Sequence, residues 1–247
     1  MTVQTTGYVV IDRCGIIENR HQVHAAVTDA TGKLLFATGD PLRITLARSA
    51  AKPAQALAIL KTGCFEQFRR LDEADLALMC ASHSSEERHI VRARAILEKI
   101  GAGEEHLRCG GHTAISEMVN REWIKRDYTP TGICNDCSGK HAGMLAGSMA
   151  AGADLTDYQL PSHPMQLRVK QVVEKLCGLE GDMVKWGIDG CNLPAPALPL
   201  QSMGKMYAAV AAAAYAVDKS EGLSFRTQAL SKIFHAMSQY PELVGWW

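Results

Sequence analysis

Hydrophobic periodicity divides this 247-residue chain into two unequal parts, and that division constrains the fold more than any single motif. Strand-like patterns are confined to residues 7–38, with a turn at Ala30-Thr31-Gly32. From residue 54 onward, apolar residues recur at helical spacing between clusters of Pro, Gly, Asn and Asp. These patterns predict strands at 8–12, 23–29 and 33–38, and helices at 54–62, 72–79, 85–100, 115–126, 140–151, 163–177, 202–217 and 225–239. Early strands followed by many helices favour an α+β fold over regular alternation.

The charge balance excludes several classes of function. Lys and Arg total 26, as do Asp and Glu, and the sequence pI is about 7.1, so nothing points to nucleic acid or an anionic membrane as partner. A small-molecule substrate is expected instead. The N-terminus lacks a signal peptide and no apolar run approaches the ~20 residues that span a bilayer, which predicts a cytoplasmic protein. The eight cysteines are therefore expected to be reduced.

A hydroxyl, an amine and a guanidinium lie together in Arg48-Ser49-Ala50-Ala51-Lys52-Pro53. On a helix, Ser49 and Lys52 share a face, so the amine could accept the hydroxyl proton if burial lowers its pKa. Pro53 places this site at a helix start, where the helix dipole would favour an oxyanion. The Ser-x-x-Lys pattern alone is weak evidence, because Ser202-Met203-Gly204-Lys205 matches it equally well in an ordinary amphipathic helix.

Cys80-Ala81-Ser82-His83-Ser84 follows an apolar helix end and precedes the next helix. The simpler interpretation makes Ser84 or Ser85 the N-cap of that helix, with acidic residues in its first turn. In the functional interpretation, Ser82 is a second hydroxyl presented from a turn and His83 is a nearby proton carrier.

The segment 135–143 brings thiol, amine, imidazole and glycine to the start of an apolar helix. A P-loop is excluded, because residue 134 is Cys and residue 141 is His where that motif requires Gly and Ser or Thr. Cys134-x-x-Cys137 could be half of a zinc site, with Cys191 as a third thiolate. Possible fourth ligands are His112, His141 and His163, although a lone histidine is more often structural.

Five segments in this order resemble the rhizobial-type L-asparaginases, also called the asparaginase II or class 3 family: Arg48–Pro53, Cys80–Ser84, Cys137–Leu145, His163-Pro164 and Asp189–Cys191. The resemblance extends from the N-terminal strands to about Val244. It implies a single domain over residues 1–247, with an antiparallel sheet and flanking helices similar to those of serine β-lactamases and glutaminases. It also implies hydrolysis of L-asparagine to L-aspartate and ammonia, by a homodimer when the chain is complete.

The resemblance assigns roles to individual residues. Ser49 and Lys52 would be a nucleophile and its base, and Ser82 a second essential hydroxyl near the substrate. The residues expected to bind substrate are Arg48, which would face its carboxylate, Asp189, His83 and His141. Zinc would be held by Cys137, Lys140 and Cys191. A lysine ligand must be a neutral amine, so Lys140 would need a strongly lowered pKa, whereas Cys134 would be a core thiol.

The sequence departs from the family pattern in three places. Ser85 and Asn192 stand where the family often has glycine. Family members also continue well past Pro241–Val244, with further strands and a second lysine that pairs with the Ser82 position. A C-terminal truncation is therefore expected, leaving sheet edges and an apolar face exposed. The alternative function is an inactive or weakly active homologue that retains zinc binding only.

Overall fold

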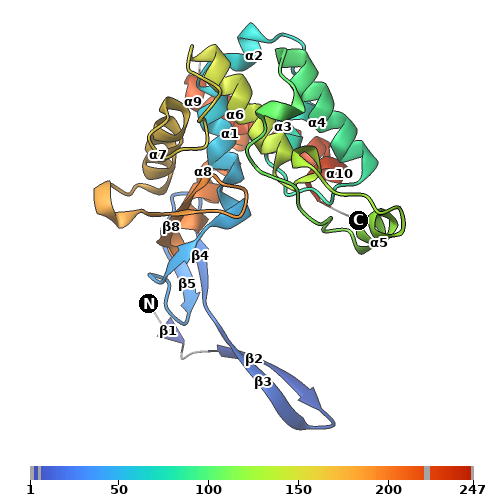
Figure 1. The fold of residues 1–247 in the computed structure, drawn as a ribbon. Coiled ribbons are helices and arrows are strands. Elements are labelled where there is room, and N and C mark those ends of the chain that lie inside the picture. Colours follow the sequence, from blue (N-terminus) through green and yellow to red (C-terminus); the bar gives the residue numbers. More distant parts are fainter. Residues whose placement is uncertain (1–2, 5–6, 220–222, 246–247) are drawn as a thin grey trace.

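Helix α1, Lys52–Leu60, is buried along its whole length and forms the centre of the helical body (Figure 1). The structure is a computed structural model that describes residues 3–4, 7–219 and 223–245. Pro53 lies in the first turn of α1, where its missing N–H costs little. Gly63, with φ +78°, follows the end of the helix. The expected helix at 54–62 is confirmed and begins two residues earlier.

The other long helices pack around α1. Helices α6, α7 and α9 contact it directly, α3 contacts α6 and α9, α4 packs on α6, and α8 packs on α9. Helices α3, α4, α6, α7, α8 and α9 bury apolar residues, as expected from the sequence, whereas α5 has no buried residue. Their bounds are α2 Cys64–Gln67, α3 Glu73–Met79, α4 Glu87–Ile100, α5 Glu117–Lys125, α6 Ser138–Ala150, α7 Pro164–Cys177, α8 Leu200–Val217, α9 Phe225–Gln239 and α10 Pro241–Val244, with 3₁₀ turns η1 Arg48–Ala51, η2 Glu104–His106, η3 Gly132–Cys134 and η4 Gly181–Met183. None of the described helices is long and apolar enough to cross a bilayer.

Two glycines let α6 lie close against its neighbours. A Cβ on Gly139 would meet the carbonyl oxygen of Leu78 in α3 at 2.7 Å, and a Cβ on Gly143 would meet Ile59 of α1 at 2.9 Å. Both distances are shorter than side-chain atoms tolerate. The glycines of the segment 135–143 therefore set how closely the start of α6 approaches α1 and α3.

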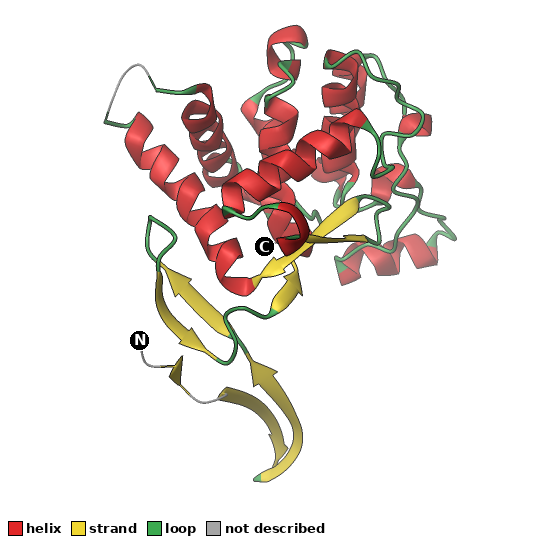
Figure 2. Ribbon diagram, turned by 90° about the vertical axis from the view of Figure 1, so that its left-hand side faces the viewer, coloured by secondary structure: helices red, strands yellow, loops and turns green. Residues whose placement is uncertain are grey.

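The described strands form three small sheets rather than one, and they lie on one side of the helices (Figure 2). Their bounds are β1 Val3–Gln4, β2 Gly7–Arg13, β3 Ile16–Val23, β4 Ala25–Thr28, β5 Leu34–Thr38, β6 Ile44–Leu46, β7 Lys185–Ile188 and β8 Pro194–Pro199. The sheet orders are β1-β5-β4, β2-β3 and β6-β8-β7, and all pairs are antiparallel except β1 with β5. The α+β class is thus confirmed, with about half of the chain helical.

The hairpin β2–β3 projects from the body. Its turn, Cys14-Gly15, has φ +52° and +84°, which suits the two-residue turns that join right-twisted strands. Strand 8–12 is confirmed, but the expected strand at 23–29 is divided between β3 and β4. Nearly all of β3 is exposed on both faces, so its sequence does not alternate and gives no strand signal.

Strand β8 lies at the centre of its sheet although Pro194, Pro196 and Pro199 argue against a central strand. Proline lacks an N–H but keeps a carbonyl, and the Pro196 carbonyl accepts a hydrogen bond from the Ala47 N–H at 2.8 Å. Since Ala47 immediately precedes η1, β8 fixes where the Ser49 segment begins.

Candidate active site

Four segments that are far apart in sequence meet beside the start of α1. They are η1 with the first residue of α1, the loop after α3, the first turn of α6, and the turn between β7 and β8. The contacts that join them are Ser49 with Ser82, Lys52 with Ser82, His83 with Ser138, Lys140 with Cys191 and Arg48 with Asp189. Every site residue expected from the sequence belongs to one of these segments.

The Ser49 and Ser82 hydroxyls and the Lys52 amine form one hydrogen-bonded chain. Ser49 Oγ lies 2.5 Å from Ser82 Oγ, and Lys52 Nζ donates to Ser82 Oγ at 2.6 Å. The amine also donates to the carbonyl of Ala81. Ser49 is exposed, Ser82 is partly buried and Lys52 is buried, so the chain runs from solvent into the protein. Lys52 is therefore linked to Ser49 through Ser82, not as the direct pair that the sequence suggests.

Burial gives Lys52 the character of a base. Removal from water lowers the pKa of Lys52, the charge of Lys140 lowers it further, and the nearby Cys137 opposes the shift. A lowered pKa increases the fraction of neutral amine, which is the form that accepts a proton. The second Ser-x-x-Lys match differs, because Ser202 and Lys205 lie inside α8 and the Lys205 side chain covers Gly32 and Gly178.

Arg48 and Asp189 form an ion pair next to this chain, with Arg48 Nε 3.0 Å from Asp189 Oδ1. The Arg48 side chain is largely exposed, whereas that of Asp189 is mostly buried. Arg48 also has φ +48°, a left-handed conformation that costs a residue with a side chain about 1–2 kcal/mol. Such strain is typical of functional sites, and here it orients the guanidinium toward Asp189 beside Ser49.

Cys137, Lys140 and Cys191 form a second buried cluster. Lys140 Nζ donates to Cys191 Sγ at 3.2 Å, and Cys137 shares a hydrogen bond with Cys191. That contact lowers the pKa of Cys191 and raises the pKa of Cys137, and the Lys140 amine favours a negative charge on Cys191. Burial opposes the charge on Lys140, but the two sulfurs outweigh it and raise the pKa of Lys140.

The donor chemistry of this cluster fits zinc, because two thiols and an amine lie together and thiolate is a preferred zinc ligand. Lys140 is charged and ion-paired in this arrangement, so it would have to lose a proton on binding a metal. Within residues 3–4, 7–219 and 223–245, no three His, Cys, Asp or Glu side chains are placed to hold a metal. A zinc site here would therefore depend on Lys140 as the third ligand.

The two expected substrate-binding histidines are fully buried. His83 Nε2 donates to Ser138 Oγ at 2.8 Å, and Nδ1 accepts from the Ser85 N–H at 3.2 Å. Burial, with the charges of His89 and Lys52, lowers the pKa of His83 to about 3, so the ring is neutral and ties the loop to α6. His141 Nδ1 is bonded to the hydroxyl of Tyr158 at 2.6 Å.

The positions where the family often has glycine are left-handed in the structure. Ser85 has φ +63° and Asn192 has φ +69°. Each side chain makes a compensating bond: Ser85 Oγ donates to the Cys134 carbonyl at 2.7 Å, and Asn192 Nδ2 donates to the Arg108 carbonyl at 3.0 Å. Neither Ser84 nor Ser85 is therefore the N-cap of α4, contrary to the prediction. Glu86 occupies the cap position and makes no side-chain cap bond.

The remaining metal-ligand candidates have other contacts. Cys134 is a core thiol beside the Tyr128 hydroxyl, as expected. His163 caps α7 by accepting the Met165 N–H at 3.1 Å, and His112 is exposed.

Two supporting residues were not anticipated from the sequence. Asn135 accepts the Cys137 N–H at 2.9 Å and so shapes the first turn of α6. An Asn two residues before the N-cap of a helix is a recognisable turn signal. Tyr158 lies in the loop after α6, and no local pattern marks it.

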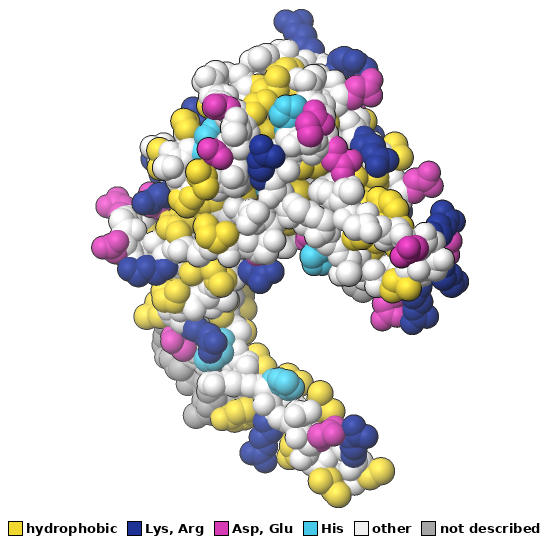
Figure 3. All heavy atoms as spheres, in the orientation of Figure 1, with side chains coloured by type: hydrophobic (Ala, Val, Ile, Leu, Met, Phe, Trp, Pro, Cys, Tyr) yellow, Lys and Arg dark blue, Asp and Glu magenta, His cyan; other side chains and the backbone are white. Residues whose placement is uncertain are grey.

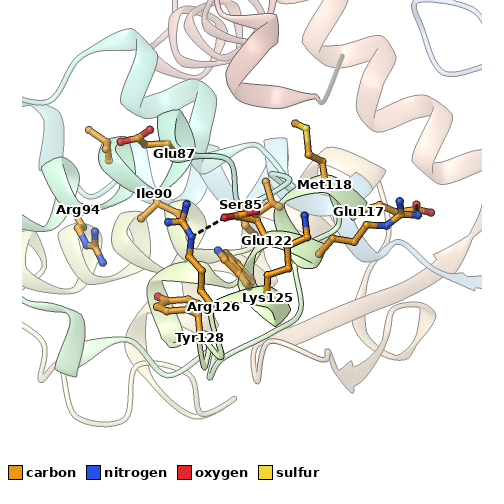
Figure 4. A pocket seen from close by; sticks show the side chains of 14 residues that line it. Ser85, Glu87, Ile90, Arg94, Glu117, Met118, Glu122, Lys125, Arg126 and Tyr128 are labelled. Carbon is orange, nitrogen blue, oxygen red and sulfur yellow. Dashed lines mark hydrogen bonds and ion pairs between the residues drawn. The ribbon is translucent and has the colours of Figure 1, made fainter.

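A broad open groove of about 930 Å³ lies elsewhere, between α4 and α5. It is lined by Ile90 of α4, by Met118 and Glu122 of α5, and by Arg126 just after α5 (Figure 4). Ser85 reaches its edge, but Ser49, Lys52 and Ser82 do not line it. The groove is therefore separate from the serine and lysine chain.

Comparison with known families gives one clear match. The profile of the family described as L-asparaginase II matches residues 9–245, a range that includes all four converging segments. Among curated proteins, none matches the chain significantly.

Proposed function

This chain belongs to the L-asparaginase II family of amidohydrolases, and on that premise we propose that it hydrolyses L-asparagine to L-aspartate and ammonia with Ser49, Ser82 and Lys52 as catalytic residues. The hydrogen-bonded chain from Ser49 through Ser82 to Lys52 carries this proposal. It links an exposed hydroxyl to a buried amine whose pKa is lowered, which is what activation of a serine nucleophile requires.

In the proposed mechanism, Ser49 Oγ attacks the side-chain carboxamide carbon of asparagine. The Ser49 proton passes to Ser82 as the Ser82 proton passes to the neutral Lys52 amine. The tetrahedral intermediate then expels its nitrogen, and Lys52 returns the proton through Ser82 so that ammonia leaves. Water hydrolyses the resulting acyl ester by the same route and restores Ser49. Ser49 is assigned as nucleophile because it is the exposed member of the chain.

The Arg48–Asp189 pair suits an amino acid substrate. The two side chains present opposite charges 3.0 Å apart beside Ser49, so a bound zwitterion could replace their mutual contact. Its carboxylate would pair with the Arg48 guanidinium, which can donate two parallel hydrogen bonds, and its ammonium group with Asp189. Because neither ring is exposed, His83 and His141 would act on the substrate site indirectly, by holding the surrounding segments in place.

Zinc would be held by Cys137, Lys140 and Cys191. When bound, it would supply a positive centre that fixes the pose of the substrate, because thiolate ligands donate charge and weaken its action as a Lewis acid. The hydrogen bonds of Ser82 with Ser49 and Lys52 involve none of these ligands, although Cys137 and Lys140 influence the pKa of Lys52.

We extend the proposal to fold, assembly and location. A Ser-x-x-Lys pair at the start of a buried helix, beside antiparallel strands, supports a relationship to serine β-lactamases and glutaminases. A homodimer follows from the same family resemblance, and the cytoplasmic location is the separate prediction made from the sequence. Analytical ultracentrifugation and cell fractionation would check these two points.

The decisive experiment measures ammonia release from L-asparagine by the purified chain and by Ser49→Ala, Ser82→Ala and Lys52→Met. All three variants are expected to lose activity. Ser202→Ala is the matched control, because it removes the serine of the other Ser-x-x-Lys match and should leave activity intact. A diazoketone analogue of asparagine, followed by peptide mass spectrometry, should label Ser49. Full activity in Ser49→Ala would refute the proposal, and zinc binding without turnover would support the alternative function.

A further inference from the structure

Tyr158 connects the loop after α6 to the buried cluster at the start of that helix. Its ring is fully buried and meets the His141 ring edge-on, with centroids 5.6 Å apart. Its hydroxyl makes two hydrogen bonds, one with His141 Nδ1 at 2.6 Å and one with the backbone N–H of Arg108 at 3.0 Å. The Tyr158 carbonyl accepts from Gln166 Nε2 at 2.8 Å, which holds the loop in place.

These bonds determine which of the two groups, the Tyr158 hydroxyl or His141 Nδ1, donates the hydrogen bond between them. The Arg108 N–H can only donate, so the Tyr158 oxygen is already an acceptor there. If His141 Nδ1 also carried a proton, the buried O–H hydrogen would lack an acceptor among the described residues, which is unfavourable for a buried donor. The hydroxyl therefore donates to Nδ1, and the proton of the neutral imidazole lies on Nε2.

The opposite ring nitrogen of His141 faces the thiol cluster. Nε2 is buried and has no partner of good hydrogen-bond geometry among the described residues. Burial lowers the pKa of His141, while an interaction with Cys191 opposes that shift. The same interaction helps to lower the pKa of Cys191. Because Tyr158 occupies Nδ1, Nε2 is the ring nitrogen left to face the Cys191 side chain.

We propose that Tyr158 is a positioning residue of the candidate metal centre, because its hydroxyl fixes the tautomer in which His141 presents an N–H to the sulfur of Cys191. The tautomer of His141 is independent of the proposed function, and only the role at a metal centre rests on it. A hydrogen bond to a thiolate fixes its orientation, and such partners behind metal ligands typically contribute a 10–100-fold factor to metal affinity.

The tautomer can be read without metal or substrate. In the metal-free full chain labelled with ¹⁵N-histidine, two-bond ¹H–¹⁵N correlation spectra distinguish the Nδ1–H, Nε2–H and charged forms. His141→Gln identifies the His141 signals. The wild-type signal is expected to show the Nε2–H form, and Tyr158→Phe should lose that single form. The matched control is Tyr128→Phe, which removes a tyrosine hydroxyl bonded to Cys134, a thiol outside the cluster, and should leave His141 unchanged.

An Nδ1–H form of His141 in the wild type would overturn the proposal, and this test does not require the variant to fold. An unchanged His141 signal in a folded Tyr158→Phe variant would overturn it as well. Competition with a chromogenic chelator, using ZnCl₂ as the probe, should show about tenfold weaker zinc binding in Tyr158→Phe than in Tyr128→Phe. A changed tautomer with equal zinc affinity in the two variants would refute the metal role, whereas loss of asparagine hydrolysis bears only on the proposed function.

Discussion

The amine of Lys52 donates its hydrogen bond to the hydroxyl of Ser82 at 2.6 Å, and Ser82 in turn lies 2.5 Å from Ser49. Ser82 is therefore the only link that the structure records, within its described residues, between the exposed hydroxyl and the buried base. A mechanism that uses this arrangement makes Ser82 as important as the nucleophile.

This relationship predicts the effect of Ser82→Ala on catalysis. Removing the Ser82 hydroxyl breaks the proton path, so kcat for asparagine should fall about 10²–10⁴-fold, the usual range for lost acid–base catalysis. Ser82→Thr keeps a hydroxyl and should retain more activity. Steady-state ammonia release provides the measurement, and a Ser82→Ala enzyme with unchanged kcat would show that Ser49 and Lys52 act without it.

The neutral state of buried His83 predicts how stability depends on pH. Its pKa in the folded protein is about 3, below the ordinary value of 6.5, so the unfolded chain binds the proton first as the pH falls. Stability should decrease from about pH 6.5 toward pH 3, with a contribution from this group of at most about 1.4 kcal/mol per pH unit. Urea unfolding at several pH values should show a shallower slope for His83→Gln, which keeps a donor for Ser138. Equal slopes would contradict the assignment.

The left-handed backbone at Ser85 predicts an unusual order of stability. Ser85→Ala and Ser85→Gly both lose the bond to the Cys134 carbonyl, but glycine also removes the strain of φ +63°. Ser85→Gly should therefore be about 1 kcal/mol more stable than Ser85→Ala. At neighbouring Ser84, outside the left-handed region, alanine should be the more stable of the two. Chemical denaturation compares the pairs, and the same order at both sites would refute the explanation.

Close packing at the start of α6 predicts the cost of Gly139→Ala. The added Cβ would meet the Leu78 carbonyl oxygen at 2.7 Å, a backbone atom that cannot move aside alone. Unfolding free energy should fall by about 1–3 kcal/mol, and activity should fall because Lys140 is displaced. Gly147→Ala meets the flexible end of Met165 and should cost less. A smaller loss at Gly139 than at Gly147 would contradict this account.

The buried pair of Cys137 and Cys191 predicts which substitutions abolish zinc binding. Replacing Cys137 and Cys191 together with serine should reduce bound zinc from about one per chain to none, because Lys140 alone is a poor ligand. Cys134→Ser removes a buried thiol outside the cluster and should leave the zinc content unchanged. Elemental mass spectrometry measures the zinc content of each variant. Stoichiometric zinc in the double variant would exclude this ligand set.

The helices could be predicted from the sequence because their apolar stripes reflect burial directly. The bounds of α9 agree with the periodicity, and those of α7 agree within one residue. Strands β3 and β8 could not be predicted, for opposite reasons. Strand β3 is exposed on both faces and has no pattern, whereas β8 is mostly buried and contains three prolines, of which Pro196 accepts a hydrogen bond through its carbonyl.

The candidate site residues could be named from the family resemblance that the ordered motifs carry, but the contacts between them could not be predicted. Sequence spacing suggests a direct pair of Ser49 and Lys52, because it carries no information on where the loop after α3 places Ser82. The sequence also does not show that Arg48 and Asp189 bind each other. Tyr158 had no signal at all, since its role depends on a contact with His141 across a loop and not on neighbouring residues.

The projecting hairpin β2–β3 has a consequence for how this protein behaves at high concentration. The outer edges of both strands carry backbone groups that pair with no other described strand, and apolar side chains including Val9, Ile11 and Ile16 are exposed along it (Figure 3). Such edges are templates for pairing between molecules. Self-association of the protein should thus depend on the β2–β3 hairpin, whereas catalysis depends on the helical part of the chain. The substitution Val9→Lys would place a charge on this edge and improve solubility without altering catalysis.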